Sequence, residues 1–213
     1  MKTSWIFFTI LLICSFTFLG WRSSSIAAPG HHGFSPANPP GESGSSHRLA
    51  ASMQVKLDHI ERNGAKARPD QTPTVMSEEE INDYLASGRV QLPEGVKKVR
   101  LQGQSGKVDA FLTVDFDKIR ASRQSSNPLL GLFSGTHDVT VESDAFGRGG
   151  QGKVHVKTVS IDGMEVPHIA LEYFVDKYVT SKYPNLGLDS HFQMPAKVDT
   201  ATVGYHKLVV TQK

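Results

Sequence analysis

Hydrophobic and polar positions alternate most regularly over residues 96–119, near the middle of the chain. The alternation has a period of two and continues on both sides of Gln104-Ser105-Gly106, which predicts a β-hairpin with one buried face. Its second strand is expected to end near Ile119. The apolar positions are Val99 and Leu101 before the turn, and Val108, Ala110, Leu112, Val114 and Phe116 after it. The carboxylates on the opposite face of the second strand are Asp109, Asp115 and Asp117, which a solvated sheet surface explains better than acid–base or metal chemistry.

Two further hairpins are predicted downstream. Alternating valines surround a glycine-rich turn at residues 146–150, and the apolar phase then shifts, which predicts a β-bulge near Lys157-Thr158. The glycines of this turn lack the Gly-Lys-Ser/Thr ending of a phosphate-binding loop, so we interpret them as turn residues. The last hairpin joins residues 197–203 to 207–211 around Gly204. The alternating residues of the earlier hairpin are Val139, Val141, Val154 and Val156, followed by Val159 and Ile161.

Two helices are predicted before the first hairpin. Four apolar residues recur at helical spacing before a stop at Asn63-Gly64. A second helix should run from Ser77 to about Ser87 and open with a capping box, in which Ser77 and Glu80 satisfy each other's exposed backbone donors. Its acidic first turn, residues 78–80, is explained by the helix dipole rather than by metal or acid chemistry. The apolar residues of the first helix are Leu49, Met53, Leu57 and Ile60.

A third helix, predicted over His168–Ser181 after Pro167, is apolar over most of its circumference and should be the helix most enclosed by the sheet. Nothing in the order of elements alternates as βαβ. The sequence therefore predicts an α+β fold. A curved antiparallel β-sheet is built from successive hairpins and is wrapped around or covered by a long apolar helix, with N-terminal helices beside it. The apolar face of the first hairpin, Val108 to Phe116, should confront this long helix.

The first 28 residues have the pattern of a secretory signal. Lys2 precedes an apolar run from Trp5 to Leu19, and small residues follow around Ser25-Ile26-Ala27. The run is nearly long enough to span a bilayer, so a retained membrane anchor is the alternative. Residues 29–46 are rich in Pro, Gly, Ser and His, which predicts a flexible tether, and residues 47–213 form a single α+β domain. We therefore expect an exported protein, periplasmic or extracellular, that is either released or anchored by its N-terminal segment.

Charge and cysteine content narrow the classes of partner. The whole chain carries a formal net charge of +2, but both charged residues of the signal, Lys2 and Arg22, are basic. The remaining chain has 21 basic and 21 acidic residues, so no basic excess indicates nucleic-acid binding. The only cysteine, Cys14, lies inside the signal, so a disulfide within the cleaved protein is excluded and stability must come from a buried core.

Catalytic chemistry has one candidate cluster. Ser134, His137 and Asp138 are close in sequence and invite comparison with nucleophilic catalysis. However, Ser134 lacks the strand–turn–helix context of a nucleophile elbow, and adjacent residues of a strand point to opposite faces. The other histidines show no metal-ligand spacing. We therefore predict a protein that is not an enzyme and that carries neither a cofactor nor a metal.

Several short motifs occur in one order: Ser77–Leu85, Leu92–Val96, Val114–Asp117, Pro128–Leu130 with Ser134-Gly135, Val166-Pro167, and Val209–Gln212. This order resembles that of the LmeA-like, phospholipid-binding family of bacterial cell-envelope proteins, and the resemblance covers roughly residues 76–212. It implies a strongly curved sheet that wraps a long helix, similar to tubular lipid-binding folds. It also implies a secreted or tethered protein that binds or shuttles lipids without altering them. The long tether departs from the family's pattern and leaves the mode of attachment open.

We hypothesise that the protein binds a lipid or another apolar small molecule in a concave, apolar site. The alternative is a tethered protein-interaction module that docks a partner through a sheet edge or an apolar patch. A membrane surface is a further candidate partner, nucleic acid is not, and the sequence identifies no protein partner. The candidate ligand-binding residues are Leu129, Leu130, Leu132 and Phe133 at the mouth of the site, and Phe111, Tyr173, Phe174 and Tyr178 in its interior. The alternative is that all eight residues simply build the core, and for the helix residues this is the favoured interpretation.

Overall fold

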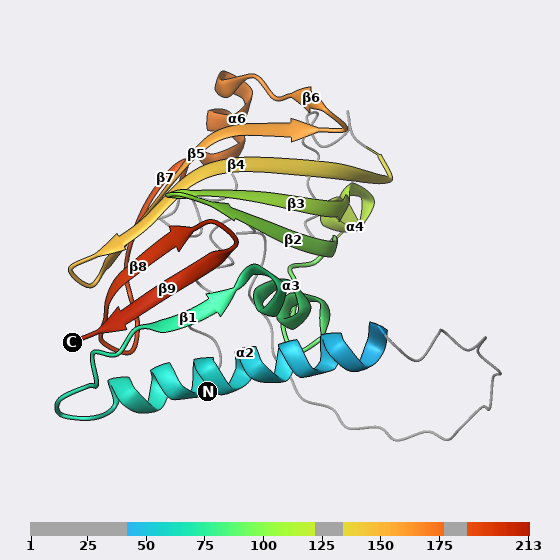
Figure 1. Cartoon of the computed structure of the whole chain (residues 1–213). Coiled ribbons are helices and arrows are strands. Elements are labelled where there is room, and N and C mark those ends of the chain that lie inside the picture. Colours follow the sequence, from blue (N-terminus) through green and yellow to red (C-terminus); the bar gives the residue numbers. More distant parts are fainter. Residues whose placement is uncertain (1–41, 122–133, 177–186) are drawn as a thin grey trace.

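Nine antiparallel strands of the described chain form one sheet, and the helix α2 (Glu42–Gly64) covers part of one face (Figure 1). The computed structural model describes residues 42–121, 134–176 and 187–213. The strands are β1 (Thr74–Ser77), β2 (Val96–Gln104), β3 (Lys107–Asp115), β4 (Thr136–Arg148), β5 (Gln151–Ile161), β6 (Met164–Glu165), β7 (Asp189–Gln193), β8 (Val198–Gly204) and β9 (Lys207–Gln212). The other helices are α3 (Glu78–Ala86), α4 (Phe116–Ala121) and α6 (His168–Val175). The α+β class predicted from the sequence is confirmed.

The long strand β4 organises the sheet. Along one side it pairs with β3 and, at its last residues, with β8, while its other side pairs with β5. The strand order is β1-β9-β8-β4-β3-β2, and β5 also carries the short strands β6 and β7. The β2–β3 and β8–β9 hairpins therefore follow one another along β4 and meet at their tips. There the Gly106 N–H donates to the Val203 carbonyl at 2.9 Å and the His206 N–H to the Gly103 carbonyl at 3.1 Å.

The predicted first hairpin is confirmed as β2–β3. Its register pairs Val99 with Leu112 and Leu101 with Ala110, so the alternating apolar residues share one face. We call this the inner face, because it packs in one core cluster with Met53 and other residues of α2. The opposite, outer face carries Arg100, Phe111 and Thr140, which are register neighbours across β2, β3 and β4.

The second strand of this hairpin ends earlier than predicted. It stops at Asp115, and residues 116–121 form α4 rather than continuing the strand to Ile119. The Asp115 carboxylate accepts a hydrogen bond from the Lys118 N–H at 3.1 Å, which satisfies an exposed donor of the new helix. This bond, with one from Lys97, lowers the pKa of Asp115. Asp117 lies in α4, where its carboxylate accepts from the Gly135 N–H at 2.8 Å.

The β-bulge predicted near Lys157-Thr158 is present. Glu142 of β4 faces Thr158 while the next residue, Ser143, faces Val156, so Lys157 is the extra residue of β5. The turn after β4 is tighter than predicted. It consists of Gly149 and Gly150, with φ angles of 63° and 80° that favour glycine. Phe146 and Gly147, expected in the turn, therefore belong to the strand. The closing hairpin β8–β9 is found as predicted.

The first two predicted helices are found. Ser77 caps α3, its hydroxyl accepting from the Glu80 N–H at 3.1 Å while Glu80 accepts from the Ser77 N–H at 2.8 Å, which is the predicted capping box. The helix α2 ends at Gly64 as expected but begins at Glu42. The last five residues of the segment predicted as a tether, 42–46, are thus helical, and residues 1–41 lie outside the described chain.

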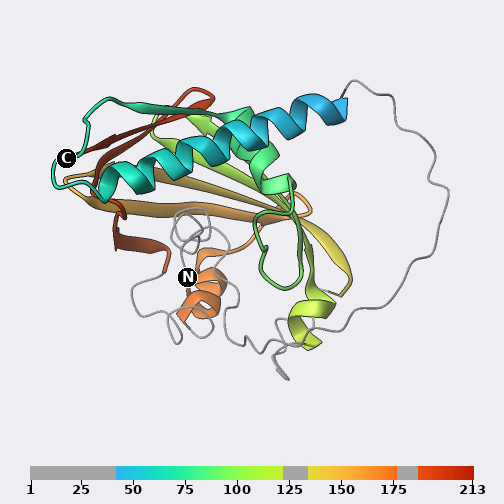
Figure 2. The same cartoon turned by 90° about the horizontal axis from the view of Figure 1, so that it is seen from below.

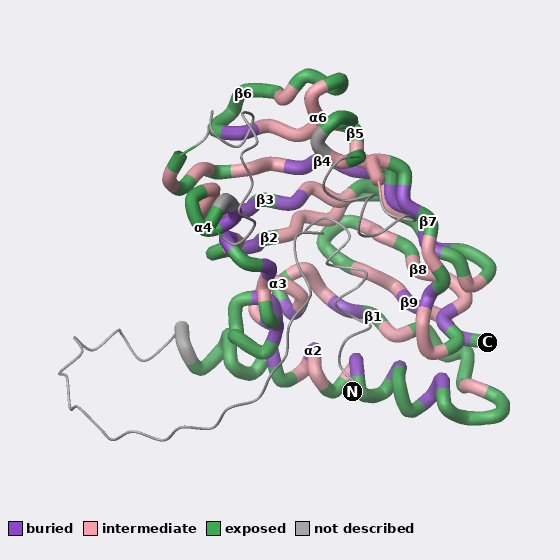
Figure 3. The backbone as a smooth tube through the Cα atoms, turned by 180° about the vertical axis from the view of Figure 1, so that it is seen from behind, coloured by how far each residue is buried: buried purple, intermediate pink, exposed green. Residues whose placement is uncertain are grey.

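The predicted strongly curved sheet around a long apolar helix is wrong for the described chain. The sheet is not strongly curled, and the third predicted helix is described only as the eight-residue α6. Ile169 of α6 is 78% exposed, whereas Leu57 of α2 is 4% exposed. Figure 2 shows α2 running across the strands, and in Figure 3 buried segments recur along α2 among exposed ones. An apolar stripe on one side of α2 specifies a single packing face, which the evenly apolar sequence of α6 does not.

Within the described ranges, no helix combines the length and the apolar character needed to cross a membrane. The predicted signal or anchor, residues 1–28, lies outside these ranges, so the location of the protein stays a prediction.

Candidate functional site: an apolar pocket between α2 and the sheet

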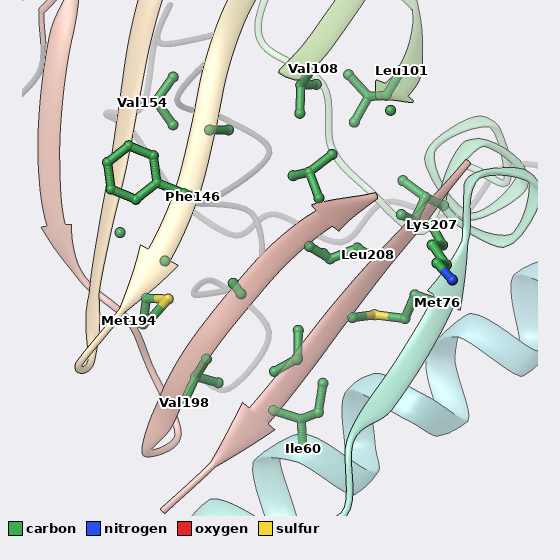
Figure 4. A pocket seen from close by; sticks show the side chains of 18 of the residues that line it. Ile60, Met76, Leu101, Val108, Phe146, Val154, Met194, Val198, Lys207 and Leu208 are labelled. Atoms are coloured by element: carbon green, nitrogen blue, oxygen red, sulfur yellow. The ribbon is translucent and has the colours of Figure 1, made fainter. Parts of the chain in front are cut away.

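A pocket of about 210 Å³ lies between α2 and the inner face of the sheet (Figure 4). The helix α2 contributes Met53, Leu57 and Ile60, the residues of its buried stripe. The sheet contributes residues from eight of its described strands. Its described apolar lining comprises Met76, Leu101, Val108, Ala145, Phe146, Val154, Phe192, Met194, Pro195, Val198, Ala201, Val203, Leu208 and Val210, together with Ile81 of α3.

Small residues on the inner face make room for two larger side chains of the lining. Gly147 pairs with both Gly152 and Ala201, so three neighbouring strands present almost no side chain at this level. The space over these small residues is filled by the side chains of Met194 and Phe192. A Cβ added to Gly147 would lie 2.5 Å from the Met194 sulfur, and one added to Gly152 would collide with the Phe192 ring. Glycine is therefore required at both positions for Met194 and Phe192 to enter the pocket.

Charged residues are few in this lining. Of the 24 described residues that line the pocket, the charged ones are Glu78, Lys153 and Lys207. Figure 4 shows Lys207 beside Met76 on one side of the pocket, and Phe146 with Val154 on the other. The Glu78 carboxylate accepts a hydrogen bond from the Gly103 N–H at 2.9 Å and lies 2.9 Å from His206 Nδ1. Such a lining favours an apolar occupant, with polar recognition confined to the rim.

Side-chain hydrogen bonds hold α2 and α3 around the pocket. Glu80 is buried and accepts from the Lys56 ammonium at 2.6 Å and from the Ser52 hydroxyl at 2.6 Å. Burial alone would raise the pKa of Glu80, but the hydrogen bonds from Lys56, Ser52 and the Ser77 N–H lower it below its usual value. The Asn82 amide donates to the Leu101 carbonyl and accepts from the Leu101 N–H, each at 2.8 Å, so α3 covers the edge of β2.

A second set of side-chain hydrogen bonds lies at the other end of α2. We call this set and the one around Glu80 the two clasps of α2. The buried Asn63 amide donates to Gln212 Oε1 at 2.8 Å and to the Asp70 carbonyl at 2.8 Å. Gln212 in turn donates to the carbonyl oxygens of Ile60 at 2.8 Å and Ala196 at 2.5 Å. The last residues of α2, the loop after it and the final strand are thus joined by one buried amide pair.

Most of the predicted binding residues cannot be placed. Leu129, Leu130, Leu132, Phe133 and Tyr178 lie outside the described residues, as does the side chain of Phe174.

The two that can be placed are Phe111 and Tyr173, and neither lines the pocket. Phe111 is 36% exposed on the outer face, where the Arg100 guanidinium lies 5.2 Å from its ring centroid. Tyr173 is 50% exposed on α6. The alternation in β3 already indicated the place of Phe111, because it shares its parity with Asp109 rather than with Val108 and Ala110. The stripe of α2 was the missed signal, since its residues were predicted as core and form one wall of the pocket.

The cluster considered for catalysis forms a different arrangement. His137 Nδ1 lies 2.5 Å from Asp162 Oδ2, and Nε2 lies 3.0 Å from the carbonyl oxygen of Ser134. Two acceptors around one imidazole favour its protonated form, and the hydrogen bond to Asp162 is the main cause that raises the pKa of His137. The Asp138 carboxylate accepts from the Thr113 hydroxyl at 3.0 Å instead. This geometry ties the start of β4 to the turn after β5.

No group of three or more potential metal ligands is found within the described part of the chain. The motifs that carry the resemblance to LmeA-like proteins fall on ordinary structural elements where they are described, such as the cap of α3 and the strand β9. Comparison of the chain with protein-family models, with curated protein sequences and with solved structures gives no match.

Proposed function

We propose that the protein is a non-enzymatic binder of a lipid or another apolar ligand, which it holds in the pocket between α2 and the inner face. The observation that carries this proposal is the composition of the lining, in which 21 of the 24 described residues are apolar or glycine. Removing apolar surface from water drives such binding without directional contacts. The secretory pattern of residues 1–28 supports a place in the cell envelope, where lipids are the abundant apolar ligands.

The experiment measures lipid uptake by the full-length protein after delipidation. Pyrene-labelled lipids with neutral and with anionic head groups are titrated, and binding is read from fluorescence. Lipid extracted from the untreated protein is identified by mass spectrometry. We expect saturable binding of at least one of these probes. Protein that carries no extractable lipid and takes up none of the probes contradicts the proposal.

A matched pair of variants in β4 locates the site. Ala145 lines the pocket, whereas Thr140 lies on the outer face of the same strand. Ala145→Trp fills pocket volume and should lower lipid affinity at least about tenfold, which corresponds to roughly 1.4 kcal/mol. Thr140→Trp adds the same side chain to the solvated face and should leave the affinity unchanged. Equal effects of the two substitutions would place the ligand elsewhere.

A protein-interaction module is the second candidate, and one observation favours it. Met164 of β6 is 68% exposed, and Ile169 and Tyr173 of α6 are also exposed, at the end of the sheet away from α2 (Figure 1). Clusters of exposed apolar residues of this kind mark interaction sites. A photo-crosslinker placed at Glu165 should then capture one partner in cells. Ile169→Asp should abolish that crosslink while lipid uptake is retained.

A further inference from the structure

Polarity is unevenly distributed around the pocket. The side near the tips of the β2–β3 and β8–β9 hairpins carries Glu78, Lys207 and Gly103, whose backbone N–H donates to Glu78 and whose carbonyl accepts from the His206 N–H. The exposed imidazole of His206 lies next to this side, against Glu78. On the opposite side Figure 4 shows Phe146 and Val154. By register Lys153 pairs with Phe146, and Phe192 pairs with Gly152 next to them, so this side is mainly aromatic and aliphatic, with Lys153 as its one charged residue in the described lining. A ligand that matches this distribution has a polar head and an apolar tail.

The charges on the polar side favour an anionic head. The Glu78 side chain is only 17% exposed and its carboxylate is already engaged by Gly103 and His206. The side chain of Lys207 is exposed and forms no hydrogen bond or ion pair with any residue that the structure describes. Figure 4 shows its amino group at the edge of the pocket beside Met76. An ammonium group with free donors at the rim of an apolar site attracts a carboxylate or phosphate.

The volume limits the tail. A cavity of about 150 Å³ accommodates one benzene molecule, so the 210 Å³ found here accommodates on the order of eight carbon atoms. That is part of one acyl chain. The second chain of a diacyl lipid would remain in water, where its methylene groups add nothing to the apolar surface that binding buries.

From these observations we infer that the preferred ligand is a single-chain amphiphile with an anionic head group. Its head contacts the Lys207 ammonium, and its chain runs along the α2 stripe toward Val154 and Phe146. The inference rests on the proposed function and deepens it by naming the ligand class and the residue that selects it.

The test is competition against a pyrene-labelled fatty acid bound to the full-length protein. The competitors share one chain and differ in head group: dodecanoate, dodecanol and dodecylammonium. A diacyl phosphatidylglycerol, presented in vesicles, tests the second chain. We expect dodecanoate to displace the probe at a concentration about tenfold lower than dodecanol, since one charge pair at a partly exposed site contributes on this scale. Dodecylammonium and the diacyl lipid should be weaker still.

Two lysine variants test the role of Lys207. Lys207→Gln should bring dodecanoate close to dodecanol while leaving dodecanol unaffected. Lys107→Gln is the matched control, because Lys107 is also exposed, lies at the neighbouring hairpin tip and does not line the pocket. Glu78→Gln removes the nearby negative charge and should strengthen dodecanoate and weaken dodecylammonium, with the Gly103 N–H still able to donate to the amide oxygen. Unchanged unfolding midpoints exclude loss of the fold.

The outcomes separate the two proposals. If dodecanoate, dodecanol and the diacyl lipid compete equally in wild type and in Lys207→Gln, while Ala145→Trp abolishes all binding, the pocket binds lipid but the head-group inference is overturned. A preference for dodecylammonium overturns it as well. If no amphiphile displaces the probe specifically and Ala145→Trp has no effect, the proposed function fails together with the inference.

Discussion

The helices α2 and α6 are held very differently by the same sheet. Leu57 of α2 is 4% exposed and lies in the main core cluster, whereas Ile169 of α6 is 78% exposed. By sequence α6 is the more apolar of the two, since six of its eight residues are apolar or aromatic. Apolar content therefore does not decide which helix covers a sheet.

The pattern of apolar residues and the polar contacts to distant strands decide which helix covers the sheet. The helix α2 has one apolar stripe, and two side-chain clasps fix it, one through Glu80 and Lys56 and the other through Asn63 and Gln212. The side-chain ion pair described for α6 joins His168 and Glu172, 3.3 Å apart within the helix itself. A stripe defines which side of a helix packs, and clasps to distant strands define where it packs.

The largest expected effect comes from truncating the same kind of side chain in each helix. Leu57→Ala removes buried atoms from the α2 interface and should lower the free energy of unfolding by about 2–5 kcal/mol. Ile169→Ala removes exposed atoms and should change it by less than about 0.5 kcal/mol. Urea unfolding followed by circular dichroism measures both values.

A large loss of stability in Ile169→Ala would break the comparison, because it would mean that α6 is packed in solution. An unchanged slope of the unfolding transition in Leu57→Ala serves as the control for a common two-state mechanism.

A smaller effect is expected from the buried clasp at the end of α2. Asn63→Ala leaves Gln212 Oε1 and the Asp70 N–H without their partner and should cost about 1–3 kcal/mol. Gln212→Ala should cost a similar amount. Because each substitution already breaks the shared hydrogen bond, the double variant should lose less than the sum of the two single losses. Strict additivity in urea unfolding would contradict a coupled clasp.

The parts of the fold that could be predicted are those that a period-two apolar pattern or a helix-capping pattern specifies locally. The β2–β3 hairpin, the bulge at Lys157 and the capping box at Ser77 depend on residues close in sequence, and all three are found. The end of β3 was predicted too late. Phe116 continues the period-two apolar pattern of the strand, but the Asp115 carboxylate accepts from the Lys118 N–H and so favours the start of a helix at this point.

The pocket was less predictable because it depends on contacts between distant segments. The parity of β3 identified Val108 as inward facing, but its neighbours in the pocket come from α2 and from β8, about fifty residues before and ninety after it. The pairing of Gly147 with Gly152 and Ala201 makes room for Met194 and Phe192 in the lining, and no local pattern links Ala201 to Gly147. The predicted interior of the site consisted of aromatic residues such as Phe111 and Tyr173, but an aromatic side chain does not indicate by itself which face of a strand or helix it occupies.

The smallest expected effect concerns how the two ends of the sheet respond to pH. The α2 end is held by Glu80, whose pKa is lowered in the folded state. Its contribution to stability is therefore complete above the ordinary pKa of a glutamate and is lost only as the pH falls through the lowered value. The end that carries β6 is held by His137 and Asp162, and the hydrogen bond from His137 lowers the pKa of Asp162. The pKa of His137 is raised, so its contribution is complete below about pH 6.5, the ordinary histidine value, and is lost as pH rises through the pKa of the folded state.

Raising the pH from mildly acidic to alkaline should therefore loosen the turn after β5 while α2 stays in place. Hydrogen exchange corrected for the intrinsic pH dependence should show faster exchange at residues 162–165 and no change at residues 53–60. Asp162→Asn should lower the pKa of His137 and remove this difference, because the main cause of the raised value is lost. Asp138→Asn is the matched control: its carboxylate binds Thr113, so the titration of His137 followed by NMR should be unchanged. Equal pH sensitivity at both ends would show that the imidazole does not anchor this turn.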